Sequence, residues 1–396
     1  MDDKRTTTHD TTRDTTIKAL HSGTLDVSAG GPAMSTYLTL RGLREAGVDA
    51  QIIMPTLPAG GRLRGEDVPV HYTAAPRVPK IGWSPTMKGD MRRIGDYDIY
   101  HAQGIWLYHT YAIVDIAREK GKPYIITPRG MLYPQDIAKS STFFKRLSLR
   151  LRLLRDLNGA ACVHVTCGEE MRHCRELGVT SPIAVIPNPV EIKDYPPHTD
   201  DGVFRVCYIG RLSPRKNVEG LIRAYAAANK GGMRTQLLII GGGDSDYERF
   251  LREEARRLGV TDVAFAGFLS GKEKDAALAT ASLLVMPSEF ENLGNVVLEG
   301  LVRRIPCIAT KGAPWEELVT RRCGWWVEYS QDAINAAVNA ALHTPGDTLA
   351  QMGARGRTLM EERYSVNAVA ADMKALYEWI VAGARRHDAP TFVNIP

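Results

Sequence analysis

Short apolar runs alternate with longer stretches of helical periodicity along most of this chain. In the first half the strand-like runs are IKALHSG, AQIIMP, DIYHAQG, PYIITPRG, VHVTCGEEM and PIAVIPNPV, and STYLTLRGLREAG and YAIVDIAREKG have the spacing of helices. Strand, helix and strand repeated in this order predict a parallel sheet with helices on both faces.

A second alternating series follows the stretch EIKDYPPHTDDG, whose Pro, Asp and Gly content suits a linker between domains. It runs from FRVCYIGRLS through QLLIIGGG, VAFAGFL and LLVMPS to helices near 333–342 and 366–382. We therefore predict an α/β protein with two doubly wound, Rossmann-like domains, residues 17–192 and 193–365, that face each other across a cleft. Residues 1–16 are low-complexity Thr/Asp/Arg sequence and are expected to be a disordered tail.

Composition supports a globular protein of more than one domain, since 44% of the 396 residues are hydrophobic. No apolar run approaches the roughly 18 residues of a membrane span, and the polar N-terminus does not resemble a signal peptide. We expect a protein that stays in the cytoplasm. The six cysteines show no metal-ligand spacing, so we expect reduced, structural thiols and no metal site; they are Cys162, Cys167, Cys174, Cys207, Cys307 and Cys323.

Positive charge is concentrated in the segment Phe143 to Leu157, FFKRLSLRLRLLRDL, which holds five basic residues and one acid. Its apolar residues recur at helical spacing, which predicts a basic amphipathic helix. Such a helix could lie on an anionic membrane surface, at the inner face of the plasma membrane. A helix that turns its apolar side to the core and its basic side to water fits the pattern equally well.

Two glycines, Gly30 and Gly31, follow the first strand and precede a helix that starts near Pro32. Adjacent glycines allow close approach of a ligand to the backbone, and amides at a helix N-terminus favour an anion such as phosphate. The same pair also serves in ordinary tight turns, and it matches neither G-x-G-x-x-G nor a P-loop.

Two cations, Arg211 and Lys216 in GRLSPRKN, follow the first strand of the second series. At the carboxyl end of a central strand they are well placed to neutralise a diphosphate without a metal ion. Solvated surface charges are the competing interpretation.

Two acids, Glu291 and Glu299, stand eight positions apart in SEFENLGNVVLEG. On one helix they would lie about 12 Å apart, whereas a loop ending at Gly294 followed by a helix would bring them closer. If a diphosphate sits near Arg211 and Lys216, the two acids could accept hydrogen bonds from a ribose and from a sugar. Two acids on a solvated helix face are disfavoured because Glu299 lies in the apolar run VVLEGLV.

At this point the motifs form a set that resembles a known family. PSEFENLGNVVLEGL looks like the E-x7-E motif of retaining glycosyltransferases of family four (GT4), which have GT-B architecture. GRLSPRKN, the glycine pair, LLIIGGG, IPNPV, TPRGML, KGAPWEEL and CGWWV are further matches, several of them typical of the bacterial exopolysaccharide, O-antigen and capsule branch. The resemblance spans roughly residues 17–382, and it implies that the last helix crosses back to the first domain.

The resemblance also implies roles for individual residues, and it implies neither a metal nor another cofactor. Arg211 and Lys216 would bind the donor diphosphate and stabilise the leaving group, and Glu291 would bind the transferred sugar. The remaining donor-site residues would be Gly30, Gly31, Asn292, Leu293, Gly294 and Glu299, with Glu299 on the ribose.

The acceptor side matches the family less closely. Many relatives carry a histidine where TPRGML has Arg129, so Arg129 is a candidate contact at that position, together with His109 and with Trp106, which could stack on a sugar. A packed structural histidine and a core tryptophan are equally compatible with the sequence. Asn292-Leu293 replaces the commoner Gly-Phe, which leaves the identity of the sugar open.

The resulting prediction is a retaining, metal-independent glycosyltransferase that moves a hexose from a nucleoside diphosphate sugar to a lipid-linked or oligosaccharide acceptor in bacterial surface polysaccharide synthesis. We expect no nucleic-acid partner. One alternative is a GT-B nucleotide-sugar epimerase or hydrolase. Another is a catalytically silent nucleotide-sugar-binding scaffold subunit, which retention of both acids and both cations disfavours.

Overall fold

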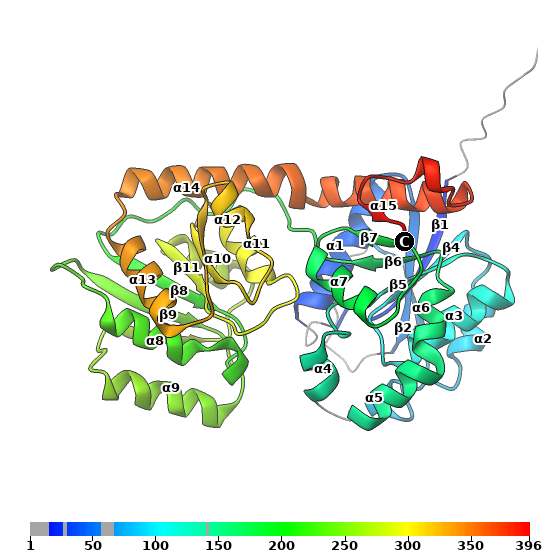
Figure 1. Cartoon of the computed structure of the whole chain (residues 1–396), viewed down its shortest axis with the longest axis horizontal. Helices are drawn as coiled ribbons and strands as arrows, with labels where there is room; N and C mark the ends of the chain where they lie inside the picture. The colour runs from blue at the N-terminus through cyan, green and yellow to red at the C-terminus, as the bar shows by residue number, and fades with distance from the viewer. Residues whose placement is uncertain (1–15, 27–29, 57–66, 140–141) are drawn as a thin grey trace, which may run out of the picture.

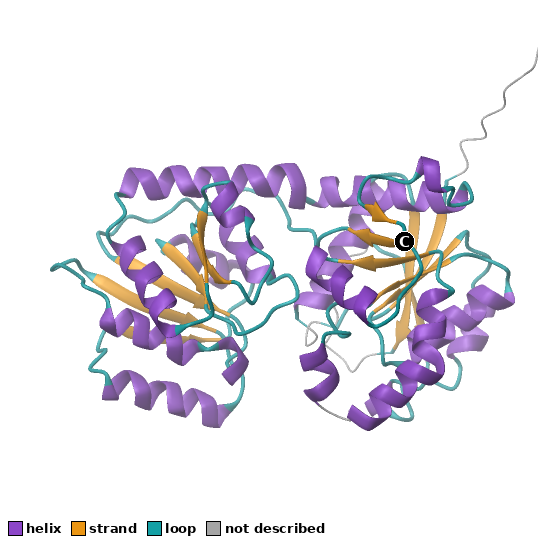
Figure 2. Ribbon diagram, in the orientation of Figure 1, coloured by secondary structure: helices purple, strands orange, loops and turns teal. Residues whose placement is uncertain are grey.

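Two α/β units make up the chain in the computed structural model, which describes residues 16–26, 30–56, 67–139 and 142–396 (Figures 1 and 2). Each unit has a twisted sheet with helices on both faces, so the predicted doubly wound α/β architecture is confirmed. All but the last residue of the expected tail, residues 1–16, lie outside the described residues.

The first sheet has the order β14-β7-β6-β5-β4-β1-β2-β3 and is parallel except for the edge strand β14, which pairs antiparallel with β7. Its strands are β1 (Lys18–Ser22), β2 (Asp49–Pro55), β3 (Val70–Thr73), β4 (Ile99–Gln103), β5 (Tyr124–Thr127), β6 (Cys162–Val165), β7 (Ile183–Val185) and β14 (Val393–Asn394). The helices around it are α1 (Gly31–Glu45), α2 (Met87–Arg93), α3 (Tyr108–Glu119), α4 (Pro134–Lys139), α5 (Thr142–Ser148), α6 (Leu154–Asn158) and α7 (Gly168–Glu176).

The second sheet is parallel throughout its described strands, in the order β10-β9-β8-β11-β12-β13. It is built from β8 (Phe204–Ile209), β9 (Thr235–Ile240), β10 (Val263–Gly267), β11 (Leu283–Met286), β12 (Cys307–Thr310) and β13 (Gly324–Val327). Its helices are α8 (Val218–Ala227), α9 (Ser245–Arg257), α10 (Gly271–Ala279), α11 (Asn295–Val302), α12 (Glu317–Thr320) and α13 (Gln331–Leu342).

A long helical segment runs along both units at the top of Figure 1. It consists of α14 (Gly346–Leu359), a π-helical turn (Met360–Tyr364) and α15 (Val366–Val381). Helix α15 packs against α1 so closely that a Cβ atom on Gly42 would lie 2.7 Å from Val366 Cγ1. The C-terminal helix therefore returns to the first sheet, and only a residue without a side chain fits at Gly42.

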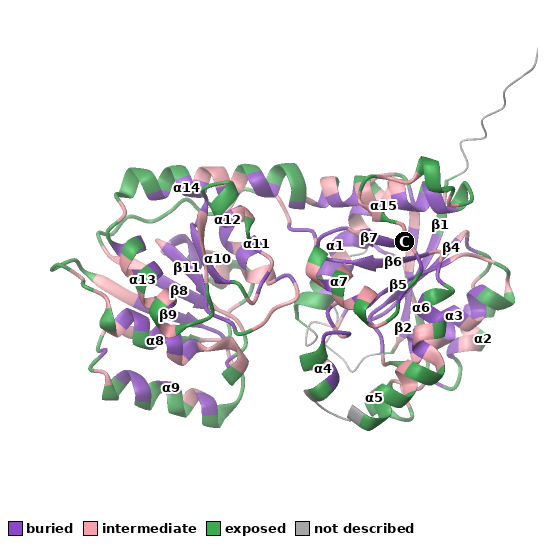
Figure 3. Ribbon diagram, viewed as in Figure 1, coloured by how far each residue is buried: buried purple, intermediate pink, exposed green. Residues whose placement is uncertain are grey.

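The basic segment 143–157 is not one regular helix. Helix α5 passes through a π-helical turn (Leu149–Leu153) into α6. The C-terminal part of the segment is anchored in the core, with Leu153 and Leu157 fully buried. Phe143, Phe144 and Leu151 are instead 71%, 70% and 69% exposed, and Figure 3 shows α5 as largely exposed. The apolar side of α5 thus faces solvent and not the core.

All six cysteines are free and buried, so the expectation of reduced, structural thiols holds in the folded chain. Burial raises the pKa of each thiol, for example that of Cys207 to about 12. A thiol with such a pKa stays protonated at neutral pH and is a poor nucleophile.

Candidate functional site

Lys216 and Glu291 meet where two neighbouring strands of the second sheet end. β8 and β11 are paired in parallel, so the loops at their carboxyl ends leave the same edge of the sheet. The amide of Glu289 donates to the carbonyl of Arg215 (2.9 Å) and ties the two loops together. The Lys216 ammonium then forms an ion pair with Glu291 Oε1, to which the Ser288 hydroxyl also donates (2.8 Å).

Only part of this pair's hydrogen-bonding capacity is used. Within the described residues, Glu291 Oε2 has no recorded partner, and Lys216 uses one of the three donors of its ammonium. The Glu291 side chain is 12% exposed and the Lys216 side chain 19%. The pair is therefore shielded from bulk water, yet can accept a hydroxyl on one side and donate to an anion on the other.

Arg211 precedes Lys216 on the loop that follows β8. The Tyr208 hydroxyl donates to its carbonyl (2.9 Å) and holds the backbone. Its exposed guanidinium makes no hydrogen bond or ion pair recorded within the described part of the chain. Arg211 is thus a cation with its donors available to a ligand.

Glu299 lies on α11, beyond the loop that carries Glu291. Gly294 caps this helix in the left-handed conformation (φ 76°), so the predicted loop ending at Gly294 followed by a helix is confirmed. Lys274, on α10, donates to Glu299 Oε2 (2.7 Å), and Arg303 lies 4.0 Å from the same oxygen. Glu299 is therefore paired, and its Oε1 atom has no recorded partner within the described residues.

The loop before α11 contacts the first domain. The Asn292 side-chain amide donates to Thr166 Oγ1 (2.8 Å), and Cys167 Sγ donates to the Asn292 carbonyl (3.4 Å). The next carbonyl, of the buried Leu293, accepts from Trp315 Nε1 (2.5 Å). The side chain of Asn292 is thus engaged at the interface between the two domains, which we call the domain seam.

Two further contacts close the seam. The ring of Phe290 packs on that of Tyr133 with centroids 4.5 Å apart, and Arg215 pairs with Asp136 of α4 (3.3 Å). Phe290 and Arg215 directly precede Glu291 and Lys216 in the sequence. The first domain therefore supports the loops that carry the Lys216–Glu291 pair.

The glycine pair lies opposite the start of α11. Gly30 is the N-cap of α1 with φ 63°, and Pro32 falls in the first turn, as expected. A Cβ atom on Gly31 would lie 3.0 Å from Asn295 Nδ2, so the N-termini of α1 and α11 come close together. Asn188 bridges them further by donating to Asn295 Oδ1 (2.9 Å).

Arg129, in the first domain, is partly buried and has a backbone φ of 54°. All five N–H donors of its guanidinium are engaged. Burial, only partly offset by Glu170, lowers its pKa to about 10, which still leaves it charged at neutral pH. Its partners are Gln103 Oε1 (3.1 and 2.7 Å), Ser35 Oγ (2.8 Å), Asn188 Oδ1 (3.2 Å) and Thr36 Oγ1 (3.0 Å).

The other two acceptor-side candidates are also partly committed to the protein. His109 is buried on α3, 3.2 Å from the Ser22 hydroxyl, and burial lowers its pKa to about 4. Trp106 donates to the Met131 carbonyl (3.3 Å), and the Lys145 ammonium lies 5.9 Å from its ring centroid. The structure thus joins Lys216 to Glu291 and brings Gly31 close to the start of α11. His109 is buried in the first domain, and the partly buried Arg129 has all its donors engaged by protein groups.

Several residues of this arrangement were not singled out from the sequence. Ser288 and Arg215 adjoin predicted site residues and could have been found by that proximity. Lys274 could not, because a lysine in the polar helix GKEKD has the pattern of a solvated charge. Within the described residues no group of His, Cys, Asp and Glu could hold a metal ion, and no helix is long and apolar enough to cross a membrane.

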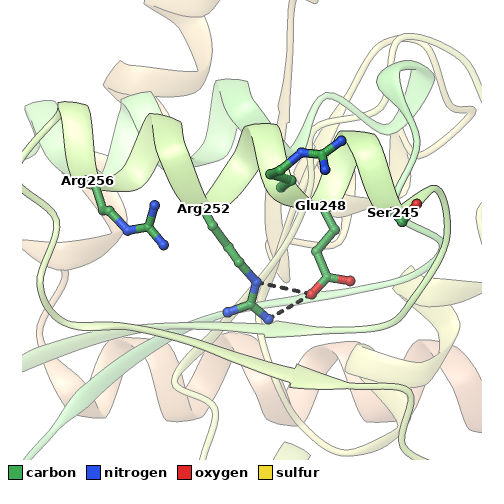
Figure 4. A pocket seen from close by; sticks show the side chains of 5 residues that line it. Ser245, Glu248, Arg252 and Arg256 are labelled. Carbon is green, nitrogen blue, oxygen red and sulfur yellow. Dashed lines mark hydrogen bonds and ion pairs between the residues drawn. The ribbon is translucent and has the colours of Figure 1, made fainter.

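A shallow groove elsewhere on the second domain is distinct from this arrangement. It lies along α9 and is lined by Ser245, Glu248, Arg249, Arg252 and Arg256 (Figure 4). Arg252 uses its guanidinium on Glu248 (2.7 and 3.1 Å), so part of the groove's charge is already neutralised.

Comparison with known families and structures agrees with this two-domain geometry. Residues 30–189 match the family described as "Glycosyl transferase 4-like domain", and residues 192–359 match "Glycosyl transferases group 1". The two matches meet at the linker between the sheets and together cover most of the chain.

Individual relatives are similar over different lengths. Alpha-D-kanosaminyltransferase of Streptomyces kanamyceticus is 34% identical over 106 residues, 26% of this chain and 27% of that enzyme. A GDP-mannose-dependent alpha-(1-6)-phosphatidylinositol monomannoside mannosyltransferase of Mycolicibacterium smegmatis is 28% identical over 69% of this chain and 75% of its own length. The chain thus spans about a quarter of the first relative and three quarters of the second.

Among solved structures, Anabaena Alr3699/HepE in complex with UDP and glucose superposes with a TM-score of 0.71. Sequence identity is 18%, and the superposition covers 91% of this chain and 99% of that one. This likeness confirms the GT-B fold.

Proposed function

We propose, for a chain that belongs to the family-four glycosyltransferases of GT-B fold, that it moves a hexose from a nucleoside diphosphate sugar to a lipid-linked or oligosaccharide acceptor. The transfer retains the anomeric configuration and needs no divalent metal. The observation that carries this proposal is the Lys216–Glu291 pair, at the carboxyl ends of two adjacent strands. Arg211 lies on the same loop as Lys216, and its guanidinium has no recorded partner among the described residues.

The two cations act on the diphosphate. As the bond between the sugar and the phosphate oxygen breaks, negative charge grows on the diphosphate. In this proposal Arg211 and Lys216 stabilise that charge, and such preorganised charge is usually the largest protein contribution to catalysis. Shielding of the Lys216 ammonium from water strengthens its interaction with the leaving group.

The two acids hold the two ends of the donor. Glu291 has Oε2 available for a hydroxyl of the transferred sugar while Lys216 and Ser288 fix its other oxygen. Glu299 has Oε1 available for a ribose hydroxyl while Lys274 fixes Oε2. Each carboxylate is thus oriented by protein groups before a donor arrives, which lowers the entropic cost of positioning it.

Retention follows when the acceptor hydroxyl attacks from the face that the diphosphate vacates. The bond between the anomeric carbon and the phosphate oxygen breaks, the bond to the acceptor oxygen forms, and the hydroxyl proton passes to the departing phosphate. The protein then supplies charge and orientation, and no side chain becomes covalently bound to the sugar.

The exposed face of α5 suggests where the acceptor is presented. Phe143, Phe144 and Leu147 are exposed on this helix, and within the described residues Arg146 and Arg150 have no recorded ion-pair partner. Exposed aromatic residues with unpaired arginines suit an anionic lipid surface. We propose a peripheral contact with the inner face of the plasma membrane and a lipid-linked acceptor in bacterial surface polysaccharide synthesis.

A thermal-shift panel with UDP, GDP, ADP and dTDP, with and without EDTA, tests the donor site. One relative is named as GDP-mannose-dependent, and one similar solved structure is a complex with UDP, so both bases belong in the panel. At about 100 times its dissociation constant, a nucleotide stabilises the fold by roughly 2.7 kcal/mol. We expect one nucleotide to raise the melting temperature equally with and without EDTA.

Two variants and a control sharpen this test. Lys216→Ala and Glu299→Ala should lose the shift, whereas Lys230→Ala, which removes a surface lysine paired with Asp262, should keep it. No response of the intact protein to any nucleotide would contradict the proposal. Binding without transfer to any lipid-linked or oligosaccharide acceptor would instead favour the silent scaffold, and release of an altered nucleotide sugar would favour the epimerase or hydrolase.

A further inference from the structure

Three buried histidines stand in a row through the centre of the first sheet. His21 lies on β1, His101 on β4 and His164 on β6, and they are 0%, 0% and 4% exposed. Burial is the main reason why the pKa of His21 is lowered to about 3 and that of His164 to about 4. The histidines are therefore neutral at physiological pH, and each has one N–H donor and one acceptor nitrogen.

A continuous chain of hydrogen bonds connects them, and its direction at the start is set by Arg129. A guanidinium can only donate, so the Gln103 side chain must present its oxygen to Arg129 and its amide nitrogen to His21 Nδ1 (3.0 Å). His21 then carries its proton on Nε2 and donates to the Tyr377 hydroxyl of α15 (2.9 Å).

The same logic fixes the second half of the chain. The Tyr377 hydroxyl has one proton, which it donates to His101 Nδ1 (2.7 Å). His101 Nε2 donates to Thr127 Oγ1 (2.7 Å), whose proton goes to His164 Nδ1 (2.9 Å). The last donor, His164 Nε2, ends on the Ile186 carbonyl (2.8 Å), which can only accept. Both ends allow one direction only, so all three histidines carry the proton on Nε2.

Arg129 also points toward the domain seam. One of its Nη1 donors binds Asn188 Oδ1 (3.2 Å), so the Asn188 amide nitrogen faces Asn295 Oδ1 (2.9 Å). Asn295 is the first residue of α11, and Glu299 lies about one turn further along that helix. A second pair of donors holds the first turns of α1 through Ser35 and Thr36.

We propose that Tyr377 is a positioning residue that acts through His21 and Gln103 on Arg129, and thereby holds Asn188 and the start of the donor-site helix α11 in register with the first domain. Tyr377 lies on α15, the helix that returns from the second domain. The chain of hydrogen bonds therefore connects that helix to the domain seam. The inference rests on the proposed donor site, because its functional effect is expected at Glu299.

The test compares two tyrosine-to-phenylalanine variants. Tyr377→Phe removes a buried hydroxyl with two hydrogen bonds, to His21 and His101. Tyr124→Phe is the matched control, because Tyr124 is also buried in the first domain and its hydroxyl also makes two hydrogen bonds, to Arg118 and the Asp156 carbonyl. A purely structural role predicts similar losses of stability in both variants and no change in the donor KM of either.

Positioning predicts a different result for Tyr377→Phe alone. We expect its KM for the nucleotide sugar to rise about tenfold while kcat changes less than twofold. A tenfold change corresponds to the net free energy of about one hydrogen bond. The ¹⁵N NMR spectrum of the intact protein should show three Nε2–H histidines with no titration between pH 5 and 8, and Tyr377→Phe should shift the His21 and His101 signals.

Either of two results would overturn the inference. One is an Nδ1–H tautomer at any of the three histidines of the intact protein. The other is an unchanged donor KM in Tyr377→Phe together with a loss of stability equal to that of Tyr124→Phe. A protein that binds no nucleotide would refute the proposed function, whereas the NMR experiment would still decide whether the chain has the stated direction.

Discussion

Lys216 and Glu291 form an ion pair across 75 residues of sequence, at the ends of two adjacent parallel strands. The pairing places the acid expected to bind the sugar in contact with a cation expected to bind the leaving group. In the free protein each neutralises the other, which stabilises two partly buried charges. A donor would find both groups already oriented.

Loss of the Lys216 ammonium should therefore have a far larger effect on kcat than on the stability of the fold. We expect Lys216→Ala to lower kcat by about 10²-fold or more, because removal of one preorganised donor from a developing charge has that magnitude. Stability should fall by about 1–3 kcal/mol, since Glu291 keeps the Ser288 hydrogen bond but loses its charged partner. Steady-state kinetics and urea unfolding measure the two effects. Lys230→Ala, with kcat unchanged, is the control, and a kcat of Lys216→Ala within threefold of the intact protein would contradict this role.

The Lys274–Glu299 pair leads to a prediction about the ribose. If Glu299 Oε1 accepts from the ribose hydroxyls, the intact protein should bind a ribonucleotide more tightly than its 2′-deoxy counterpart. Glu299→Gln should remove most of that preference, and Lys274→Ala should reduce it by freeing the carboxylate. Calorimetric titration with both nucleotides gives the ratio of dissociation constants. Lys193→Ala breaks the neighbouring pair with Asp275 and should leave the ratio unchanged; an equal ratio in all four proteins would exclude Glu299 from the ribose.

Much of the fold could be predicted from the chain, because buried parallel strands are apolar runs bounded by turns, as in LLVM before Glu291. The edges of the sheets were less accessible. β3, β13 and β14 were not predicted as strands, since four half-buried residues or two terminal ones give no clear period. α14 was missed as well, although it carries a helical burial pattern over 14 residues.

The site divides in the same way. Cations and acids at strand ends were predictable from position, and the turn at Gly294 was predictable from its glycine. Partners contributed by remote elements were not. Lys274 reaches Glu299 from another helix, and Asn188 reaches Asn295 from 107 residues away. Such pairs are decided by how the domains pack, and a single sequence contains no local signal of that packing.

The exposed phenylalanines of α5 predict binding to anionic vesicles. Phe143→Glu combined with Phe144→Glu should abolish co-flotation with vesicles containing anionic lipid, because it replaces two aromatic groups that are 71% and 70% exposed with acids. Phe268→Glu is a matched control, since Phe268 is 74% exposed on the second domain. Binding of the intact protein should weaken as salt rises. Equal flotation of the double variant and the intact protein would rule out this face, as would binding to neutral vesicles that is insensitive to salt.

Neutral buried histidines predict a loss of stability on mild acidification. The folded-state pKa of His21 is about 3, and those of His109 and His164 are about 4, all below the ordinary 6.5 of the unfolded chain. Between pH 6.5 and these values the unfolded chain binds protons that the folded protein does not, so the free energy of unfolding falls as pH falls. The stabilisation is complete above pH 6.5, and each histidine contributes a slope of up to about 1.4 kcal/mol per pH unit below it.

Ordinary carboxylates, with pKa values near 4, contribute little to the slope between pH 6.5 and 5. Burial raises the pKa of Glu170 and of Asp372, so these two groups contribute a slope of the opposite sign. Urea unfolding at half-unit intervals measures the slope. His109→Asn is the informative variant, since its side-chain amide can replace the ring nitrogen that faces the Ser22 hydroxyl, as donor or as acceptor, and cannot be protonated in this range. In this variant the free energy of unfolding should depend less steeply on pH, by the contribution of one histidine. The hydrogen bonds that connect His21 to His164 should stay intact. A free energy of unfolding that stays constant from pH 7 to 5 in the intact protein would mean that these histidines are charged, or exposed, in the folded state.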